Sequence, residues 1–212
     1  MRIIAFATQK GGCGKSTLAA SLAIAAQEAG ERVHVIDMDP KKSVIRWAAK
    51  RKDVDLPVCA VSSAKLPVVL NDLSKKNVSL VVLDTPAFES PASLAAIKVA
   101  DLSIVPARPA LFDIWASEVT GRKLRLMDRE FVFLLNQCPP ALAALRVRAS
   151  IAALEANGTV LRPHISARAV FLEATEKGKG VTEIDHNGEA AREMRELWLS
   201  LKRQLPLSRT LR

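Results

Sequence analysis

A short glycine-rich segment near the N-terminus carries the residue types that bind phosphate groups. It reads Lys10-Gly11-Gly12-Cys13-Gly14-Lys15-Ser16-Thr17. Glycines let successive backbone N–H groups turn inward around phosphate oxygens, and the ammonium group of Lys15 can bind the terminal phosphates. The hydroxyl of Ser16 is a suitable Mg²⁺ ligand, and that of Thr17 can donate to the α-phosphate. The segment therefore predicts a site for a nucleotide and Mg²⁺.

A strand and a helix must hold this segment in place. Ile3–Thr8 is an apolar run typical of a strand buried on both faces, and Lys15–Ala29 has helical periodicity. The N-terminus of that helix would add the positive end of its dipole to the glycine loop. The structural alternative, a glycine-rich turn that arose by chance, does not account for this context.

Strands and helices alternate along the rest of the chain. Further strands are predicted at Val33–Asp37, Leu80–Asp84, Leu102–Pro106, Phe131–Leu135 and Thr159–Arg162. Further helices are predicted at Ser43–Lys52, Ser90–Val99, Asp113–Met127, Ala141–Ala156 and Gly188–Leu205. This alternation predicts a doubly wound α/β fold, with a mostly parallel sheet and helices on both faces. We expect one domain over residues 1–212, frayed at 206–212.

Two strand ends carry aspartates that could act near a metal. Val33–Asp37 leads into Asp39 and Pro40, and Leu80–Asp84 ends in Asp84 itself. The carboxyl ends of parallel strands face the ligand crevice, and a spacing of two puts Asp37 and Asp39 on one face of an extended chain. The structural alternative is a turn in which aspartate accepts hydrogen bonds from nearby backbone N–H groups.

The charge balance favours a polyanionic partner. The chain has 31 lysines and arginines against 22 aspartates and glutamates, which gives a net charge of +9. This excess suits nucleic acid or an anionic membrane surface and does not choose between them. No apolar run is long enough to span a bilayer, so we expect a cytoplasmic protein. The cysteines show neither a disulfide framework nor a zinc pattern: Cys13, Cys59 and Cys138.

The glycine-rich segment departs from the general phosphate-loop pattern. Gln9 stands where that pattern has its first glycine, and Lys10-Gly11-Gly12 follows. In this the chain resembles the ATPases with a deviant Walker A motif, the ParA/MinD family. The resemblance implies a P-loop NTPase fold in which ATP is sandwiched between two subunits. Lys15 would bind the ATP of its own subunit, and Lys10 would reach the nucleotide of the partner. Both lysines are therefore expected to take part in catalysis.

The aspartates fit the same resemblance. Asp37-x-Asp39-Pro40 resembles the family's switch I motif, and Asp84-Thr85-Pro86 resembles its Walker B and switch II motifs. By this resemblance Asp39 orients or deprotonates the attacking water, and Asp84 holds a water on Mg²⁺. Asp37 lies just behind the Mg²⁺ ligands, so the expected metal site consists of Ser16, Asp37 and Asp84. The implied activity is conversion of ATP and water to ADP and phosphate.

The resemblance continues into the second half of the chain. Pro106-x-x-Pro109 followed by Asp113 matches the family's partition members, and Asn136 matches the residue that reads the adenine edge. No guanine-binding signature of the form Asn-Lys-x-Asp occurs, so ATP is favoured over GTP. The alternative for Asn136 is a turn residue that ends a strand.

Basic residues of this half are candidate DNA contacts. Partition ATPases of the family bind DNA non-specifically as ATP-bound dimers, through lysines and arginines of this half. The candidates here are Arg146, Arg148, Arg162, Arg168, Arg192, Arg195, Lys202 and Arg203. Contacts of this kind would make binding strongly dependent on salt. The alternative for each residue is an ordinary solvated helix face.

The last predicted helix bears on membrane binding. It carries an apolar stripe made of Met194, Leu197, Trp198 and Leu201. MinD-like proteins end in a basic amphipathic membrane anchor, but no linker separates this helix from the body of the protein. We therefore expect the stripe to pack on the sheet, and we expect Trp47 and Trp115 to be packing residues as well.

These patterns predict a small ParA-type ATPase, without the N-terminal helix-turn-helix of larger partition ATPases. It would form a homodimer with ATP and hydrolyse ATP weakly under stimulation by a small ParB-like adaptor. It would position plasmid, chromosome or protein cargo on nucleoid DNA, and no membrane partner is expected. The alternatives are a MinD-like membrane-cycling ATPase and a metabolic ATPase of the same superfamily. The absence of tyrosine excludes a tyrosine autokinase, and the cysteines do not suit an iron–sulfur cluster.

Overall fold

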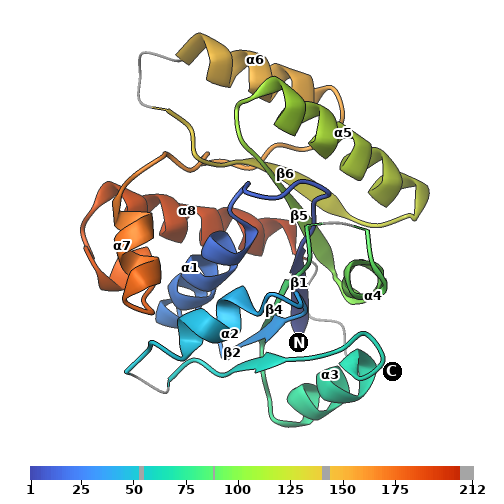
Figure 1. The fold of residues 1–212 in the computed structure, drawn as a ribbon, viewed down its shortest axis with the longest axis vertical. Helices are drawn as coiled ribbons and strands as arrows, with labels where there is room; N and C mark the ends of the chain where they lie inside the picture. The colour runs from blue at the N-terminus through green and yellow to red at the C-terminus, as the bar shows by residue number, and fades with distance from the viewer. Residues whose placement is uncertain (53–54, 88, 140–143, 206–212) are drawn as a thin grey trace.

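A single parallel sheet forms the centre of the protein (Figure 1). The computed structural model describes residues 1–52, 55–87, 89–139 and 144–205. Six strands lie in the order β3-β2-β4-β1-β5-β6, and every pairing between them is parallel. They are β1 (Arg2–Phe6), β2 (Val33–Asp37), β3 (Val58–Ala60), β4 (Leu80–Asp84), β5 (Leu102–Ala107) and β6 (Phe131–Leu135). The predicted doubly wound α/β fold is confirmed.

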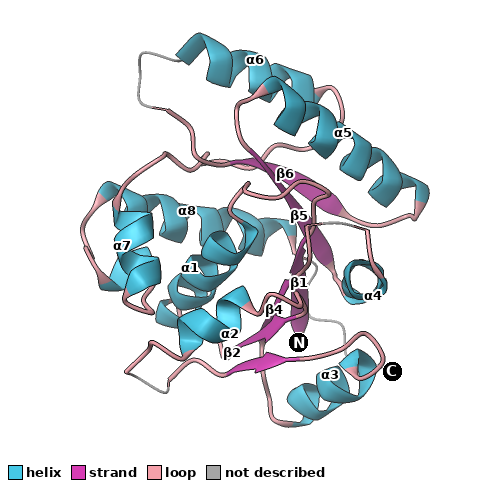
Figure 2. Cartoon of the chain, in the orientation of Figure 1, coloured by secondary structure: helices cyan, strands magenta, loops and turns pink. Residues whose placement is uncertain are grey.

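Helices cover both faces of this sheet (Figure 2). One face carries α1 (Lys15–Glu28), α2 (Ser43–Ala48), α7 (Val170–Glu176) and α8 (Glu189–Gln204), next to the short 3-10 helix η2 (Val181–Glu183). The other carries α3 (Leu66–Lys75), α4 (Pro91–Val99), α5 (Leu111–Leu126) and α6 (Ala144–Glu155). In β1, Ile4 and Phe6 pack on the first face, while Ile3 and Ala5 pack on the second. Burial of both faces explains the continuous apolar runs of the strands.

The strand register brings the acidic strand ends together. Asp37 of β2 is paired with Asp84 of β4, and Asp84 is paired with Phe6 of β1. The chain leaves β1 at this same edge to form the glycine-rich loop and α1. The switch I and Walker B candidates therefore lie beside the phosphate loop, as expected from the carboxyl ends of parallel strands.

Several elements differ from the sequence-based prediction. Thr159–Arg162 does not form a strand, because only an isolated bridge joins Val160 to Phe133. Four elements were missed: β3, α3, α7 and the 3-10 helix η2. The predicted helix Ala141–Ala156 begins at Ala144 in the described chain, and the predicted frayed tail at 206–212 lies outside the described residues. Short elements give too few repeats of a hydrophobic period to be recognised from sequence.

The apolar stripe of α8 is part of the core. Met194, Leu197, Trp198 and Leu201 are each at most 1% exposed, and α8 packs against α1. The prediction that this stripe packs inside the protein is confirmed. Trp47 is also buried, whereas Trp115 on α5 is 51% exposed, so the packing expected for Trp115 was wrong. No helix within the described ranges is long and apolar enough to cross a membrane.

A buried carboxylate links the start of the sheet to its last helix and should set the acid stability of the fold. Glu31 accepts hydrogen bonds from Arg2 (2.6 Å) and from the hydroxyl of Ser79 (2.6 Å), and it pairs with Lys202 at 3.2 Å. Burial by itself would raise the pKa of Glu31, but these partners together lower it to about 2. Since the pKa of an unfolded glutamate is about 4.3, the interaction stabilises the fold above that pH. It is lost as the pH falls toward 2.

We therefore expect Glu31→Gln to lower the free energy of unfolding at pH 6 and to have progressively less effect toward pH 2. Urea unfolding of both proteins across this pH range measures the difference. The matched control is Glu173→Gln, because Glu173 forms an exposed pair with Lys177 and should contribute little. If wild type and Glu31→Gln lose stability in parallel on acidification, Glu31 does not have this role.

Candidate functional site

The glycine-rich loop adopts the backbone conformation that its sequence requires. Gly12 and Gly14 have φ angles of +79° and +90°, in the region that glycine adopts without strain. A Cβ atom on Gly14 would lie 2.4 Å from Nδ2 of Asn136. Asn136 donates a hydrogen bond to the carbonyl of Cys13 (2.8 Å), and Gln137 donates to that of Gly12 (3.2 Å). Glycine at position 14 thus allows the end of β6 to hold the loop closely.

The first turn of α1 faces the loop and is free to bind an anion. Gly14 is the N-cap of this helix, no side chain caps it, and its first turn contains no acidic residue. The unpaired N–H groups and the positive end of the helix dipole suit a phosphate group. Lys15 is 7% exposed, and its ammonium donates to the carbonyl of Lys10 at 3.5 Å. The ammonium of Lys15 therefore lies against the loop, where phosphates would be held.

Asp84 and Ser16 form a pair of oxygen donors suited to Mg²⁺. The Ser16 hydroxyl donates to Oδ2 of Asp84 at 2.6 Å, while Oδ1 of Asp84 is buried without a hydrogen-bond partner in the described structure. Burial raises the pKa of Asp84 to about 7, the nearby Asp37 adds to this rise, and the hydrogen bond from Ser16 opposes it. A buried carboxylate oxygen without a partner, next to a hydroxyl, is the donor set that a hard cation prefers. These residues fit a magnesium site.

Asp37 stands behind this pair and also anchors α2. Its carboxylate accepts from the backbone N–H groups of Val44 (2.9 Å), Ile45 (3.1 Å) and Asp39 (3.0 Å). Burial raises the pKa of Asp37, and these three hydrogen bonds oppose the rise. The end of β2 is thus connected to the first turn of the helix that follows switch I.

Asp39 lies two residues beyond the end of β2 and is partly exposed. Its Oδ1 accepts from the N–H of Lys41 at 2.9 Å, which is the turn that sequence analysis gave as the alternative. One carboxylate oxygen therefore stabilises the loop, and a catalytic role remains a prediction.

The side chain of Lys10 is bound outside the phosphate loop, at the start of α5. Its ammonium pairs with Asp113, which is buried at the start of α5, and lies 5.8 Å from the ring centre of Phe112. Arg108 pairs with the same carboxylate. Burial acts to raise the pKa of Asp113, but its hydrogen bonds to Arg108 and Lys10 outweigh burial and lower it. Phe112 is 70% exposed, so the ammonium of Lys10 lies near the surface, whereas Lys15 is buried.

A cavity of about 450 Å³ lies beside Gly14. It is lined by Gly14, Thr17, Leu18, Asn136 and Gln137, and by residues of the segment from Ser166 to Leu172. Its size and position beside the loop suit the base of a nucleotide. Sequence analysis predicted Asn136 at the base and Thr17 at the α-phosphate, but it missed the segment 166–172 as part of the nucleotide site. No motif marks that segment, which the bridge between Cys138 and Ser166 holds in place.

Comparison with known proteins identifies the family. Residues 1–166 match the family model described as an AAA domain. Over 198 residues the chain is 29% identical to the maintenance of carboxysome distribution protein A of Halothiobacillus neapolitanus, which covers 89% of this chain and 90% of that protein. It is 29% identical over 132 residues to protein ParA of Rhizobium radiobacter, covering 61% of this chain and 58% of that protein. The chain is a ParA-type member of the ParA/MinD ATPase family.

A solved structure agrees with this assignment at the level of fold. The septum site-determining protein MinD of Pyrococcus horikoshii, solved with Mg-ADP, superposes with a TM-score of 0.76 at 19% identity, over 96% of each chain. The ParA-type chain therefore has the P-loop fold of its relatives.

The basic residues predicted to contact DNA divide into two groups in this ParA-type ATPase. Five have carboxylate partners: Arg162 with Glu155 (3.7 Å), Arg168 with Glu193 (3.1 Å), Arg192 with Glu189 (2.5 Å), Arg195 with Glu28 (3.2 Å) and Lys202 with Glu31 (3.2 Å). Among the described residues, Arg146, Arg148 and Arg203 have none. The paired residues offer less free charge to DNA, and all eight remain predictions.

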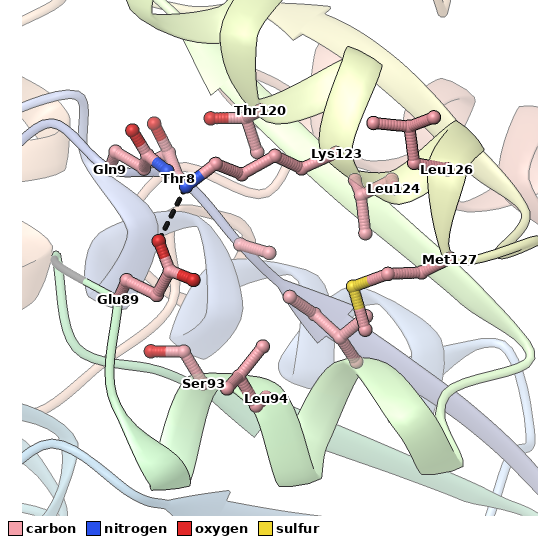
Figure 3. A pocket seen from close by; sticks show the side chains of 12 residues that line it. Thr8, Gln9, Glu89, Ser93, Leu94, Thr120, Lys123, Leu124, Leu126 and Met127 are labelled. Carbon is pink, nitrogen blue, oxygen red and sulfur yellow. Dashed lines mark hydrogen bonds and ion pairs between the residues drawn. The ribbon is translucent and has the colours of Figure 1, made fainter.

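A second cavity of this ParA-type ATPase, of about 310 Å³, lies between α4 and α5 behind the start of the phosphate loop (Figure 3). Thr8 and Gln9 form one end, and Leu94 and Met127 are among its apolar walls. Lys123 pairs with Glu89 across it. Because the two charged residues of its described lining neutralise each other, this cavity does not suit a triphosphate. No group of three or more histidines, cysteines or acids that could hold a metal occurs within the described ranges.

Proposed function

We propose that this chain is an ATP-hydrolysing positioning ATPase that dimerises around ATP and then binds DNA without sequence preference. The observation that carries the proposal is the separation of its two motif lysines. Lys15 is buried against its own phosphate loop, whereas Lys10 lies outside that loop on Asp113. A lysine placed in this way can bind a nucleotide on a second copy of the chain once it leaves Asp113.

Binding of ATP uses the groups at the carboxyl edge of the sheet. The N–H groups of the loop and of the first turn of α1 would hold the phosphates, together with the ammonium of Lys15. The side chains of Ser16 and Asp84 would hold Mg²⁺, with Asp37 behind them, and Mg²⁺ when bound would neutralise charge on the phosphates. The base would occupy the 450 Å³ cavity beside Asn136.

Hydrolysis then depends on Asp39 and on Lys10. Asp39, which follows β2 and is partly exposed, would orient the attacking water or accept its proton. Lys10 would exchange Asp113 for phosphate oxygens of the nucleotide bound by the partner copy. Arg108 lowers the cost of this exchange, because it keeps the buried carboxylate of Asp113 paired after Lys10 leaves.

The names of two relatives support an inference about the cargo and its adaptor. One relative is named for carboxysome distribution and another is named ParA. We infer that this chain likewise distributes a large cargo, either a plasmid or chromosome or a protein complex. A small adaptor on that cargo would stimulate hydrolysis. The burial of the α8 stripe supports DNA rather than a membrane as the surface on which it works.

The non-hydrolysing variant Asp39→Ala with ATP is expected to retard unrelated DNA fragments equally, at least about tenfold more tightly than the ADP form. A dimer presents twice the cationic surface to one duplex, and non-specific affinity rises steeply with the number of phosphate contacts. Raising salt from about 50 to 200 mM should weaken binding by about a thousandfold or more. Gel retardation at several salt concentrations measures both effects.

Flotation with anionic liposomes, run in parallel, is the control for the MinD-like alternative. That alternative predicts ATP-dependent flotation that is lost when residues 188–212 are deleted. Flotation without DNA retardation would overturn the proposed function.

A further inference from the structure

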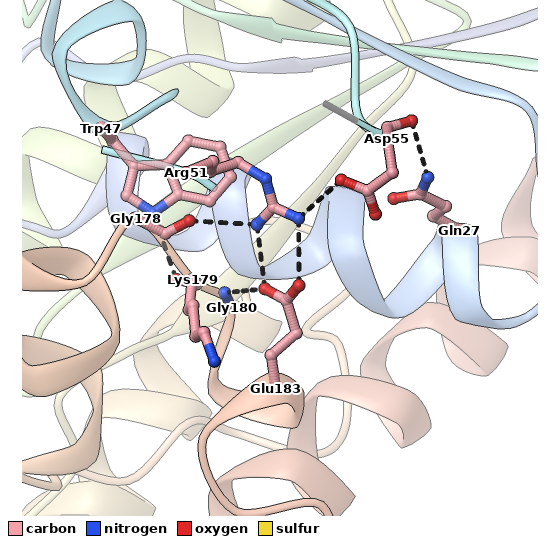
Figure 4. A network of polar contacts seen from close by, with 8 residues as sticks. All are labelled: Gln27, Trp47, Arg51, Asp55, Gly178, Lys179, Gly180 and Glu183. Atoms are coloured by element: carbon pink, nitrogen blue, oxygen red, sulfur yellow. Dashed lines mark hydrogen bonds and ion pairs between the residues drawn. The ribbon is translucent and has the colours of Figure 1, made fainter. Parts of the chain in front are cut away.

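Polar contacts join Trp47 and Arg51, near the end of α2, to Gly178 and Lys179, just beyond α7 (Figure 4). A basic pocket of about 510 Å³ lies at this junction. Its lining comprises Lys50, Arg51 and Lys52 from one segment and residues 176–179 from the other. The second segment contributes Lys177 and Lys179, so four lysines from distant parts of the sequence converge. Glu176 is the only acidic residue among the lining residues.

The two segments are built to lie close together. Gly178 has a φ angle of +67°, and a Cβ atom there would lie 2.6 Å from the backbone nitrogen of Arg51 and 2.7 Å from the carbonyl carbon of Lys50. Only glycine allows this approach of one backbone to the other. Trp47 adds a hydrogen bond from its ring nitrogen to the carbonyl of Lys179 at 3.1 Å. The lysines are thus held on fixed backbones.

Arg51 fastens this junction and contributes no free charge to the pocket. Its side chain is 4% exposed and binds both carboxylate oxygens of Glu183, at 2.9 and 3.0 Å. It also binds Asp55 at 2.8 Å and the carbonyl of Gly178 at 3.0 Å. The positive charge that faces solvent therefore comes from the lysines.

That charge is largely uncompensated. Lys50, Lys52 and Lys179 are exposed, and within the described residues none of them has a carboxylate within ion-pair distance, whereas Lys177 pairs with Glu173. Like charges gathered in one pocket repel one another, and a bound anion removes that repulsion. This pocket differs in this respect from the five predicted DNA contacts that are paired with acids.

We propose that this pocket binds phosphates of the nucleic-acid backbone and forms part of the DNA-binding surface; the proposal rests on the proposed function. The solvent-facing groups of the pocket are ammonium groups, which suit phosphate oxygens. Contacts to phosphates do not depend on the base sequence. The lining also has no large apolar side chain that could enter a lipid layer. Both features suit non-specific binding to a duplex.

The pocket is connected to the nucleotide site through a single short helix. The carboxylate of Asp37 accepts from the first turn of α2, and the pocket begins just beyond its last residue, Ala48. Lys50 and Lys52 follow two and four residues after the end of α2, so a shift of α2 at its switch I end would move them. This connection gives a physical route by which bound ATP can affect DNA affinity.

The test compares two triple variants of equal charge. Lys50→Ala with Lys52→Ala and Lys179→Ala removes the pocket's free lysines. Lys65→Ala with Lys75→Ala and Lys98→Ala removes three exposed lysines from the opposite face of the sheet, which have no carboxylate partner among the described residues. In an Asp39→Ala background with ATP, we expect the pocket variant to bind DNA at least about tenfold more weakly. The slope of its log affinity against log salt concentration should fall by the equivalent of about two phosphate contacts per protomer. The DNA affinity of the control should change less than about threefold.

The outcomes separate this proposal from the proposed function. A pocket variant that binds DNA like the control overturns the role of the pocket and leaves the proposed function standing. A wild-type protein that fails to retard DNA overturns both. Binding to phosphatidylglycerol vesicles that the pocket variant loses, without DNA retardation by the wild type, would assign the pocket to lipid headgroups instead. Unchanged affinity of both variants for a fluorescent ATP analogue checks that they are folded.

Discussion

Lys15→Ala is expected to lower the affinity for ATP by at least about a hundredfold. The ammonium of Lys15 is buried against the loop, so it is desolvated and fixed before ATP arrives. Each charge-assisted hydrogen bond to phosphate contributes about 1.5–3 kcal/mol, and two such bonds account for the loss. Titration of a fluorescent ATP analogue measures it.

Lys10→Ala is the matched control, because it removes the other motif lysine and leaves the loop intact. We expect this variant to bind ATP with nearly normal affinity but to remain a monomer and lose hydrolysis. The backbone carbonyl of Lys10 accepts a hydrogen bond from Lys15, whereas the ammonium of Lys10 pairs with Asp113. Sedimentation velocity with ATP decides the matter. A Lys10→Ala protein that dimerises like the wild type contradicts the shared site.

Asp39→Ala is expected to bind ATP, to accumulate as a dimer and to lose at least about a hundredfold in turnover, the contribution of a positioned general base. Phosphate release under saturating ATP measures the rate, and sedimentation measures the dimer. Alanine, however, removes two things at once, since Asp39 also accepts from the N–H of Lys41.

Asp39→Asn separates these two roles. Its amide oxygen can still accept from Lys41 and preserve the turn, but the side chain can no longer act as a base. We expect Asp39→Asn to lose turnover nearly as fully as Asp39→Ala. Wild-type turnover in Asp39→Asn, with a loss only in Asp39→Ala, would mean that Asp39 is solely a turn residue.

The centre of the sheet and the phosphate loop could be predicted from the amino-acid pattern. Val33–Asp37, Leu80–Asp84 and Phe131–Leu135 form strands with the predicted bounds, because unbroken apolar runs of this length are stable only when buried on both faces. Gly12 and Gly14 adopt positive φ angles that few other residues tolerate. Parallel strands also end at one edge, so the amino-acid pattern alone places Asp37 and Asp84 together. The strands and the loop depend on neighbouring residues in the chain, and the meeting of Asp37 with Asp84 depends only on the parallel arrangement of the strands.

Most contacts between side chains of distant elements, in contrast, could be known only from the folded structure. Thr159–Arg162 has the composition of a strand but forms a single bridge, because its place at the edge beside β6 was not determined by its own residues. Lys10 could be recognised as a motif lysine, yet its pairing with Asp113 depends on β5 lying next to β1. The same holds for the arginines that are paired with acids and for the lysines that converge at Gly178. The charge available at a surface depends on which elements become neighbours, and that follows from the order of the strands rather than from any local pattern.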